Sequence, residues 1–221
     1  VKSFLGCVMA GIIPAPISPP MMAKGSETLA PAAARIVEDA QANVLLTTEA
    51  SKPFAEQILE LTNGETRLLT METAFAEPAP PFDPPQIQPE DICFLQYTSG
   101  STTLPRGVMV SHGNLMANMR GFMGQRGMYP GPEDVGVSWL PLYHDMGLIG
   151  FILGPLVYIG PVVVLATSAF ARDPRIWLKT LHKYRGTITY APNFAYAQVV
   201  KRLRDSDLEN LPGIGGWKHC G

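Results

Sequence analysis

Residues 97–107 read YTSGSTTLPRG and lie between two apolar runs, residues 92–96 and 108–110. The first run predicts a buried strand and the second a further short strand. Residues 98–107 carry five Ser or Thr hydroxyls, two glycines and one arginine. Glycine lets backbone N–H groups turn toward a bound group, hydroxyls add donors, and arginine offers a fork that matches phosphate oxygens. The pattern therefore predicts an anion-binding loop.

The residues alone leave a second interpretation of this loop open, a polar surface turn between two strands. The density of hydroxyls and the exit into a strand favour the anion site. The loop is not a Walker A motif, because that motif runs through Gly-Lys-Ser/Thr into a helix, whereas Gly107 is followed by Val108.

The strings TSGST at residues 98–102 and PRGV at residues 105–108 resemble the phosphate-binding loop of the adenylate-forming superfamily. Its members are acyl-CoA synthetases, peptide-synthetase adenylation domains, luciferases and fatty acyl-AMP ligases. The family pattern usually has Gly at position 103 and Lys at position 106, so Arg106 keeps the charge while Thr103 removes backbone freedom. By this resemblance the ATP phosphates are bound by Thr98, Ser99, Gly100, Ser101, Thr102, Thr103, Arg106 and Gly107.

The composition narrows the class of protein. The 221 residues suffice for one large or two small domains, and 46% hydrophobic against 16% charged residues can fill a core. The net charge of -2 predicts no nucleic-acid partner. Cys7, Cys93 and Cys220 are odd in number and far apart, so we expect a reducing, cytoplasmic setting and no metal site. No signal peptide is visible. The chain begins inside a predicted helix and ends inside a motif, so we interpret it as a fragment.

Residues 146–167 contain no charge and are long enough to span a bilayer. Six glycines and prolines interrupt this run, which favours a short helix, a turn and a buried strand at 162–165 over a membrane span.

The first third of the chain alternates helical and extended patterns, which predicts an α/β fold with a parallel sheet. The predicted helices are 1–10, 28–41 with Pro31 in its first turn, and 52–61 with Ser51 as N-cap; the predicted strands are a short edge strand at 12–17, 44–46 and 67–69. Six prolines between residues 76 and 90 predict a linker between two subdomains, 1–75 and 91–221.

The rest of the chain continues this alternation. The predicted helices are 112–125 with Ser111 as N-cap, a helix capped by Asp173 with Ile176, Trp177, Leu181 and Tyr184 on its buried face, and a helix opening at 191–196; the predicted strands are 135–140 and 187–190.

A second motif, WLPLYHDMGL at residues 139–148, follows the predicted strand 135–140. A histidine satisfied at a strand end is one interpretation of the His144–Asp145 pair. The pair is not part of a Ser-His-Asp triad, because sequence neighbours in an extended chain cannot both point at one centre. The string is similar to the second core motif of the superfamily, and its YHDMGL wording resembles fatty acyl-AMP ligases. That resemblance implies that His144 lies beside the substrate carboxylate, with Asp145 also at the substrate.

Two further segments carry the resemblance. APNFAY at residues 191–196 is similar to a segment that borders the acyl pocket in fatty acyl-AMP ligases, which implies substrate contacts for Asn193, Phe194 and Tyr196. An ordinary strand-to-helix turn with two core aromatics is the alternative. WKHCG at residues 217–221 resembles the start of the strand and loop that contact adenine.

The resemblance implies part of the large α/β N-terminal domain of an adenylate-forming enzyme, with mixed or parallel sheets flanked by helices. The implied reaction joins a fatty acid carboxylate to AMP from ATP, with Arg106 and His144 as catalytic residues. Mg²⁺ is expected with ATP, its usual glutamate ligand lying beyond residue 221. The implied acceptor is an acyl carrier protein or a polyketide or peptide synthase. The alternatives are an acyl-CoA synthetase and, from another class, a degenerate domain that binds nucleotide or protein without turnover. The fragment alone is expected to be inactive.

Overall fold

The computed structural model describes residues 1–19, 26–76, 78, 80–98, 105–209, 211 and 216–221. The chain forms two compact units, Val1–Leu115 and Met116–Gly221, and each is described by itself. The predicted subdomains 1–75 and 91–221 remain a prediction.

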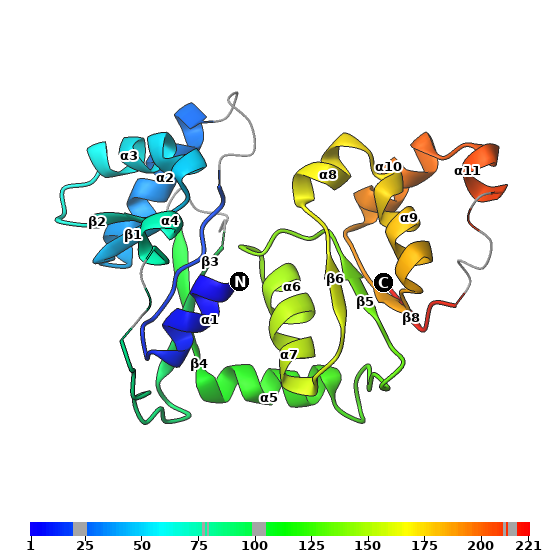
Figure 1. Cartoon of the computed structure of the whole chain (residues 1–221), viewed down its shortest axis with the longest axis horizontal. Helices are drawn as coiled ribbons and strands as arrows, with labels where there is room; N and C mark the ends of the chain where they lie inside the picture. Colours follow the sequence, from blue (N-terminus) through cyan, green and yellow to red (C-terminus); the bar gives the residue numbers. More distant parts are fainter. Residues whose placement is uncertain (20–25, 77, 79, 99–104, 210, 212–215) are drawn as a thin grey trace. The chain divides into compact units, whose positions relative to one another are not determined.

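In its described residues, the first unit contains a parallel pair of strands, an antiparallel pair and the helices α1 to α4 (Figure 1). The helices are α1 (Lys2–Met9), α2 (Ser26–Asp39), α3 (Lys52–Glu60) and α4 (Met71–Ala74), with a 3₁₀ turn η2 at Glu49–Ser51. The strands are β1 (Val44–Thr47) and β2 (Arg67–Thr70), which are parallel, and β3 (Ile92–Thr98) and β4 (Arg106–Ser111), which are antiparallel. The predicted strands on either side of the hydroxyl-rich loop are therefore confirmed.

Small residues bring α2 close to the parallel strands. Ala30, Ala33, Ala34 and Val37 repeat at helical spacing, and all four are buried. They pack in one cluster with Leu45 of β1 and with Ala55 and Ile58 of α3.

Three predictions for this unit need correction. Residues 12–17 form no strand, because Pro14 and Pro16 have no N–H for a ladder; the Pro14 carbonyl instead accepts a bond from Leu95 N (3.0 Å). Helix α2 begins at Ser26, two residues earlier than predicted, so Pro31 lies inside it. Ser51 is at the N-cap position of α3, but its side chain makes no capping hydrogen bond.

The second unit is built on a four-stranded parallel sheet in the order β6-β5-β7-β8. Its strands are β5 (Gly136–Ser138), β6 (Val162–Val164), β7 (Ile188–Thr189) and β8 (His219–Cys220). Its helices are α6 (Asp145–Leu148), a π-helical turn η3 (Ile149–Leu153), α7 (Gly154–Tyr158), α8 (Thr167–Arg172), α9 (Arg175–Tyr184), α10 (Asn193–Arg202) and α11 (Asp205–Glu209). In Figure 1, α6 and α7 lie on one side of β5 and α9 on the other.

Helix α5 (His112–Met123) spans the boundary between the units. Its predicted cap is confirmed, since Ser111 Oγ accepts a bond from Asn114 N (3.1 Å) and Asn114 Oδ1 accepts one from Ser111 N (3.2 Å).

The core of the second unit is aromatic. Trp139 stacks on Phe170 with ring centroids 3.6 Å apart, and Trp177 packs edge-on against both rings. The Trp177 indole N–H donates to Thr189 Oγ1 (2.9 Å), and that hydroxyl donates to the Val137 carbonyl (2.8 Å). One buried chain of bonds therefore ties α9 to β7 and β5.

Helix α9 begins at Arg175 with Pro174 at the N-cap position, one residue later than predicted, although Asp173 still bonds to its first turn. It also departs from the prediction at its end. Asp173 Oδ1 accepts a bond from Arg175 N (3.1 Å), as expected of a capping residue. Trp177 and Leu181 are buried, whereas Tyr184 is 45% exposed. The helix ends at Tyr184 and the chain turns at Arg185 (φ 52°), which leaves the ring at the surface, within 5.1 Å of the Lys183 ammonium nitrogen.

The uncharged run 146–167 folds as α6, η3, α7 and β6, in keeping with the predicted short helix, turn and strand. Within the described ranges, no helix is long and apolar enough to cross a membrane. Strand β6 is half-buried rather than buried, and β5 and β7 are shorter than predicted.

A buried carboxylate joins the beginnings of three strands. Asp134, 4% exposed, accepts bonds from Gly131 N (2.8 Å) and Thr187 Oγ1 (2.7 Å) and lies 3.1 Å from Lys218 Nζ. Burial opposes ionisation, but these hydrogen bonds and the ammonium charge outweigh it and lower the pKa of Asp134.

Candidate functional site

The antiparallel hairpin of the first unit carries the ends of the hydroxyl-rich loop. Thr98 ends β3 and Arg106 begins β4, and the two residues pair in the ladder. Ser99, Gly100, Ser101, Thr102 and Thr103 lie outside the described residues. Of the predicted phosphate site, the structure therefore places Thr98, Arg106 and Gly107 together at one end of the hairpin.

The Arg106 side chain is exposed, and in the described part of the chain no carboxylate pairs with its guanidinium. An arginine with its donors free at the edge of a loop can bind an anion at low cost in competing interactions. This geometry agrees with an anion site.

A residue that the sequence reasoning missed lies beside these two. Tyr97 is paired with Gly107 across the hairpin, and its hydroxyl donates to Asp39 Oδ2 (2.6 Å). Burial and the neighbouring Asp39 carboxylate raise the pKa of the Tyr97 phenol, so the hydroxyl remains a donor at neutral pH. The signal available in the sequence was the register itself, since a hairpin closed by Thr98 and Arg106 must pair Tyr97 with Gly107.

The chain turns sharply at His144, so the histidine and its neighbour touch. His144 is the extended N-cap of α6 (φ −99°, ψ 141°), and its Nδ1 lies 2.6 Å from Asp145 Oδ1. The prediction assumed an extended chain here, in which the two side chains would diverge; the helix that starts at Asp145 brings them together.

The hydrogen-bond geometry assigns the proton on this histidine. Nδ1 lies 3.3 Å from Met146 N, while Asp145 Oδ1 accepts from the same N–H at 2.7 Å. The Met146 N–H therefore donates to Nδ1 as well as to Asp145 Oδ1, so Nδ1 is an acceptor in the neutral ring and Nε2 carries the proton. The side chain of His144 is 59% exposed, so its Nε2 is accessible to a substrate.

The three predicted acyl-pocket residues stand at the start of α10. Asn193 is exposed, and Phe194, 53% exposed, packs edge-on near Trp139 at 6.2 Å. Tyr196 packs on Trp177 at 5.2 Å, and its hydroxyl donates to the Gly221 carbonyl (2.7 Å). Tyr196 thus links α10 to the end of β8, the segment that resembles an adenine-contacting strand.

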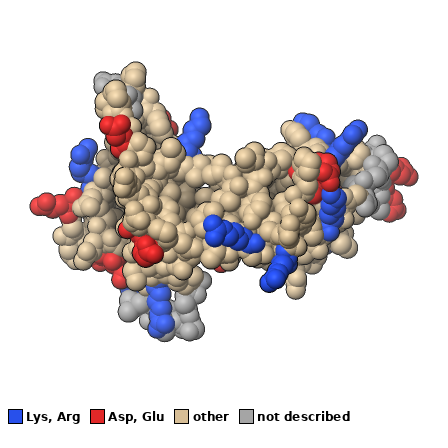
Figure 2. All heavy atoms as spheres, turned by 90° about the horizontal axis from the view of Figure 1, so that it is seen from below, with Lys and Arg blue, Asp and Glu red and all other residues tan. Residues whose placement is uncertain are grey.

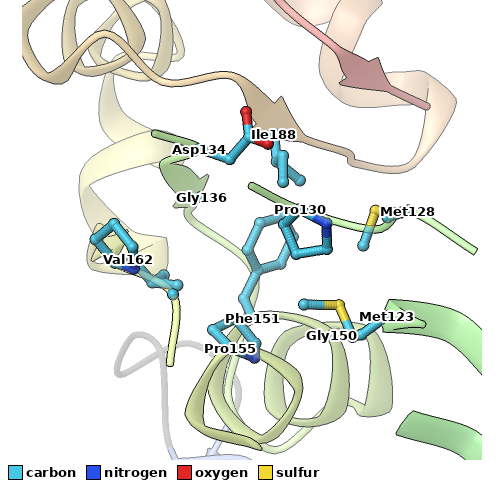
Figure 3. Close-up of a pocket in the computed structure, with 12 residues that line it drawn as sticks. Met123, Met128, Pro130, Asp134, Gly136, Gly150, Phe151, Pro155, Val162 and Ile188 are labelled. Carbon is cyan, nitrogen blue, oxygen red and sulfur yellow. The ribbon is translucent and has the colours of Figure 1, made fainter. Parts of the chain in front are cut away.

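A small apolar cavity of about 20 Å³ lies between the π-helical turn and the sheet (Figure 3). It is lined by Met123, Met128, Pro130, Asp134, Gly136, Gly150, Phe151, Pro155, Gly160, Pro161, Val162 and Ile188. Its volume suits about one water-sized group. Beside it, the Tyr190 hydroxyl packs so closely on Gly150 that a Cβ there would lie 1.9 Å from the hydroxyl oxygen.

Among the residues that the structure describes, no three His, Cys, Asp or Glu side chains gather as a metal site. On the face shown in Figure 2, basic and acidic side chains are scattered between large uncharged areas, and neither sign forms a continuous patch.

Known proteins resemble this chain over its whole length. The model of the AMP-binding enzyme family matches residues 1–216. A putative acyl-CoA synthetase from Caulobacter vibrioides is 36% identical over 100% of this chain and 38% of its own length. The long-chain-fatty-acid–AMP ligase FadD26 from Mycobacterium marinum is 35% identical over 96% of this chain and 36% of its own.

Solved structures of fatty acyl-adenylate ligases are similar to this chain as well. One from a study of fatty acyl-adenylate ligases from E. coli and L. pneumophila superposes with a TM-score of 0.93 at 34% identity, over 100% of this chain and 39% of that one. The fatty acyl-adenylate ligase from L. pneumophila in complex with acyl adenylate and pyrophosphate gives 0.82 at 35% identity, over 99% and 37%. The chain therefore spans less than two fifths of the length of these relatives.

Proposed function

The chain belongs to the family of AMP-binding enzymes, and from this we propose that the whole protein activates a fatty acid as its acyl-adenylate. A carboxylate oxygen of the acid attacks the α-phosphorus of ATP, the bond from that phosphorus to the bridging oxygen breaks, and the electron pair leaves with pyrophosphate. The observation that carries the proposal is the hairpin end, where Thr98 lies beside the guanidinium of Arg106, which pairs with no carboxylate among the described residues. The likeness to a fatty acyl-adenylate ligase with acyl adenylate and pyrophosphate bound supports it.

In this proposal the side chains of this protein hold the charged groups of ATP and of the fatty acid in place. Arg106 and Thr98 hold phosphate oxygens, and Arg106 stabilises the charge that grows on pyrophosphate. His144 donates from Nε2 to the carboxylate, and the exposed ring of Phe194 offers an apolar surface to the acyl chain. Mg²⁺ bound with ATP would neutralise phosphate charge, and the proposal assigns it no ligand among the described residues.

Arg106→Ala should raise the KM for ATP or lower kcat about ten- to a hundredfold in the whole protein, because a hydrogen bond from a charged donor contributes about 1.5–3 kcal/mol. Arg106→Lys should be milder, since it keeps the charge but loses the fork. Arg126→Ala, which removes another exposed arginine, is the matched control. Pyrophosphate release at varied ATP measures the effect, and wild-type kinetics for Arg106→Ala would reduce Arg106 to a surface charge.

We further propose that the acyl group passes to an acyl carrier protein. One relative, 47% identical over 61% of this chain and 20% of its own length, is the medium-chain-fatty-acid–[acyl-carrier-protein] ligase TtuA from Teredinibacter turnerae. The runner-up acceptor is coenzyme A, which the name of the Caulobacter relative favours. The cytoplasmic setting expected from three free cysteines belongs to the same proposal.

The acceptor can be tested directly. The whole protein, given ATP, magnesium and a medium- or long-chain fatty acid, should form acyl-AMP and load a phosphopantetheinylated carrier protein, with little acyl-CoA when coenzyme A replaces the carrier. Mass spectrometry of both thioesters decides the matter. Efficient acyl-CoA formation would assign the protein to the synthetases, and ATP binding without acyl-AMP would indicate a degenerate domain.

A further inference from the structure

Near the end of the β3–β4 hairpin, a tyrosine lies opposite a glycine. Thr98 pairs with Arg106 at the end of the ladder, and Tyr97 pairs with Gly107 one step before it. A Cβ built on Gly107 would lie 2.8 Å from Tyr97 Cζ and 3.0 Å from its hydroxyl oxygen. The phenol therefore lies across the glycine backbone, a place that only a residue without a side chain leaves open. An aromatic ring over a cross-strand glycine pins the register of a hairpin.

The partner of this phenol comes from a distant element. Asp39 is the last residue of α2, and it accepts the Tyr97 hydroxyl at 2.6 Å across 58 residues of sequence. A carboxylate at the C-terminus of a helix faces the negative end of the helix dipole and is unfavourable there. The last turn of α2 contains no basic residue to offset it. The hydrogen bond from the Tyr97 hydroxyl to the Asp39 carboxylate offsets this unfavourable interaction with the helix dipole.

We propose that Asp39 and Tyr97 are positioning residues: their hydrogen bond fixes the phenol over Gly107 and so holds Thr98 and Arg106 in place to bind the phosphates of ATP. This inference rests on the proposed function. Neither side chain touches ATP in this account, and their effect reaches the phosphates only through the hairpin end. The contribution concerns ATP and not the fatty acid.

The test compares variants of the whole protein. Tyr97→Phe keeps the ring and loses the hydrogen bond, and it should raise the KM for ATP about three- to tenfold with the KM for the fatty acid and the melting temperature unchanged. Asp39→Ala should match it, Asp39→Asn should restore most of the loss because the amide oxygen still accepts, and the double variant Asp39→Ala/Tyr97→Phe should be no worse than either single one. Tyr129→Phe, which removes an exposed phenol hydroxyl, is the control.

A second measurement is independent of turnover. Amide hydrogen exchange at Thr98, Arg106 and Gly107 without substrate should be faster in Tyr97→Phe and in Asp39→Ala than in the wild type and in Tyr129→Phe. Unchanged exchange, or equal increases in both KM values, would overturn the inference. A wild type that forms no acyl-AMP would refute the proposed function instead, and the exchange measurement would still decide whether this bond orders the hairpin end.

Discussion

Replacing His144 by alanine should lower the rate of acyl-adenylate formation about a hundredfold or more, the usual effect of losing one preorganised donor to a reacting oxygen. The reason is geometric. Nδ1 accepts from Met146 N and lies 2.6 Å from Asp145 Oδ1, which fixes the ring and leaves the exposed Nε2–H to donate to the substrate carboxylate. Affinity for ATP should change little, because no phosphate contact is assigned to His144. Rapid-quench measurement of acyl-AMP alongside ATP titration separates the two.

Two further variants sharpen this prediction. Asp145→Asn keeps a polar side chain that can hydrogen-bond with Nδ1 and should cost less activity than Asp145→Ala, which removes the side chain that contacts the ring. His144 is also the N-cap of α6, so its replacement could act through folding. Equal losses of ATP binding and adenylation together with a lower melting temperature would identify His144 as a capping residue alone.

Trp177→Ala should destabilise the protein by about 3–5 kcal/mol, the range for truncating a buried aromatic side chain. Trp177 is 2% exposed, packs against Trp139, Phe170 and Tyr196, and donates to Thr189. Trp177→Phe keeps most of the packing and leaves Thr189 Oγ1 without this donor, so it should cost about 1–2 kcal/mol. Urea denaturation followed by far-UV circular dichroism measures both, and a loss below about 1 kcal/mol for the alanine variant would contradict this account of the core.

The helices and strands that the sequence predicted correctly are those determined by residues close together in the chain. The apolar runs on either side of the hydroxyl-rich loop are β3 and β4, and the Ser111 cap forms as its sequence predicts. The α/β class followed from the alternation of helical and extended patterns. The place of His144 after a strand was visible too, whereas the helix that begins at Asp145 was not predicted.

The features that the sequence did not predict depend on contacts between residues that lie far apart in the chain. Residues 12–17 have a strand-like apolar pattern, but their prolines leave only carbonyls for pairing, and one of them meets Leu95. The π-helical turn at 149–153 depends on packing against a sheet that forms from other segments. The bond between Asp39 and Tyr97 joins residues 58 positions apart, and no periodicity reports such a pairing.

The buried Asp134 has a consequence for the order of synthesis. Its carboxylate bonds to Thr187, 53 residues later, and to Lys218, 84 residues later. At about 5–20 residues per second, a ribosome delivers Lys218 about 4–17 s after Asp134. Throughout that interval the nascent sheet lacks the cation that offsets burial of this charge, so closing the β5–β7 pair over Asp134 is unfavourable before β8 arrives. Closing this part of the sheet therefore waits until Lys218 and β8 have left the ribosome, and a nascent chain stalled before residue 218 should keep the start of β5 in water.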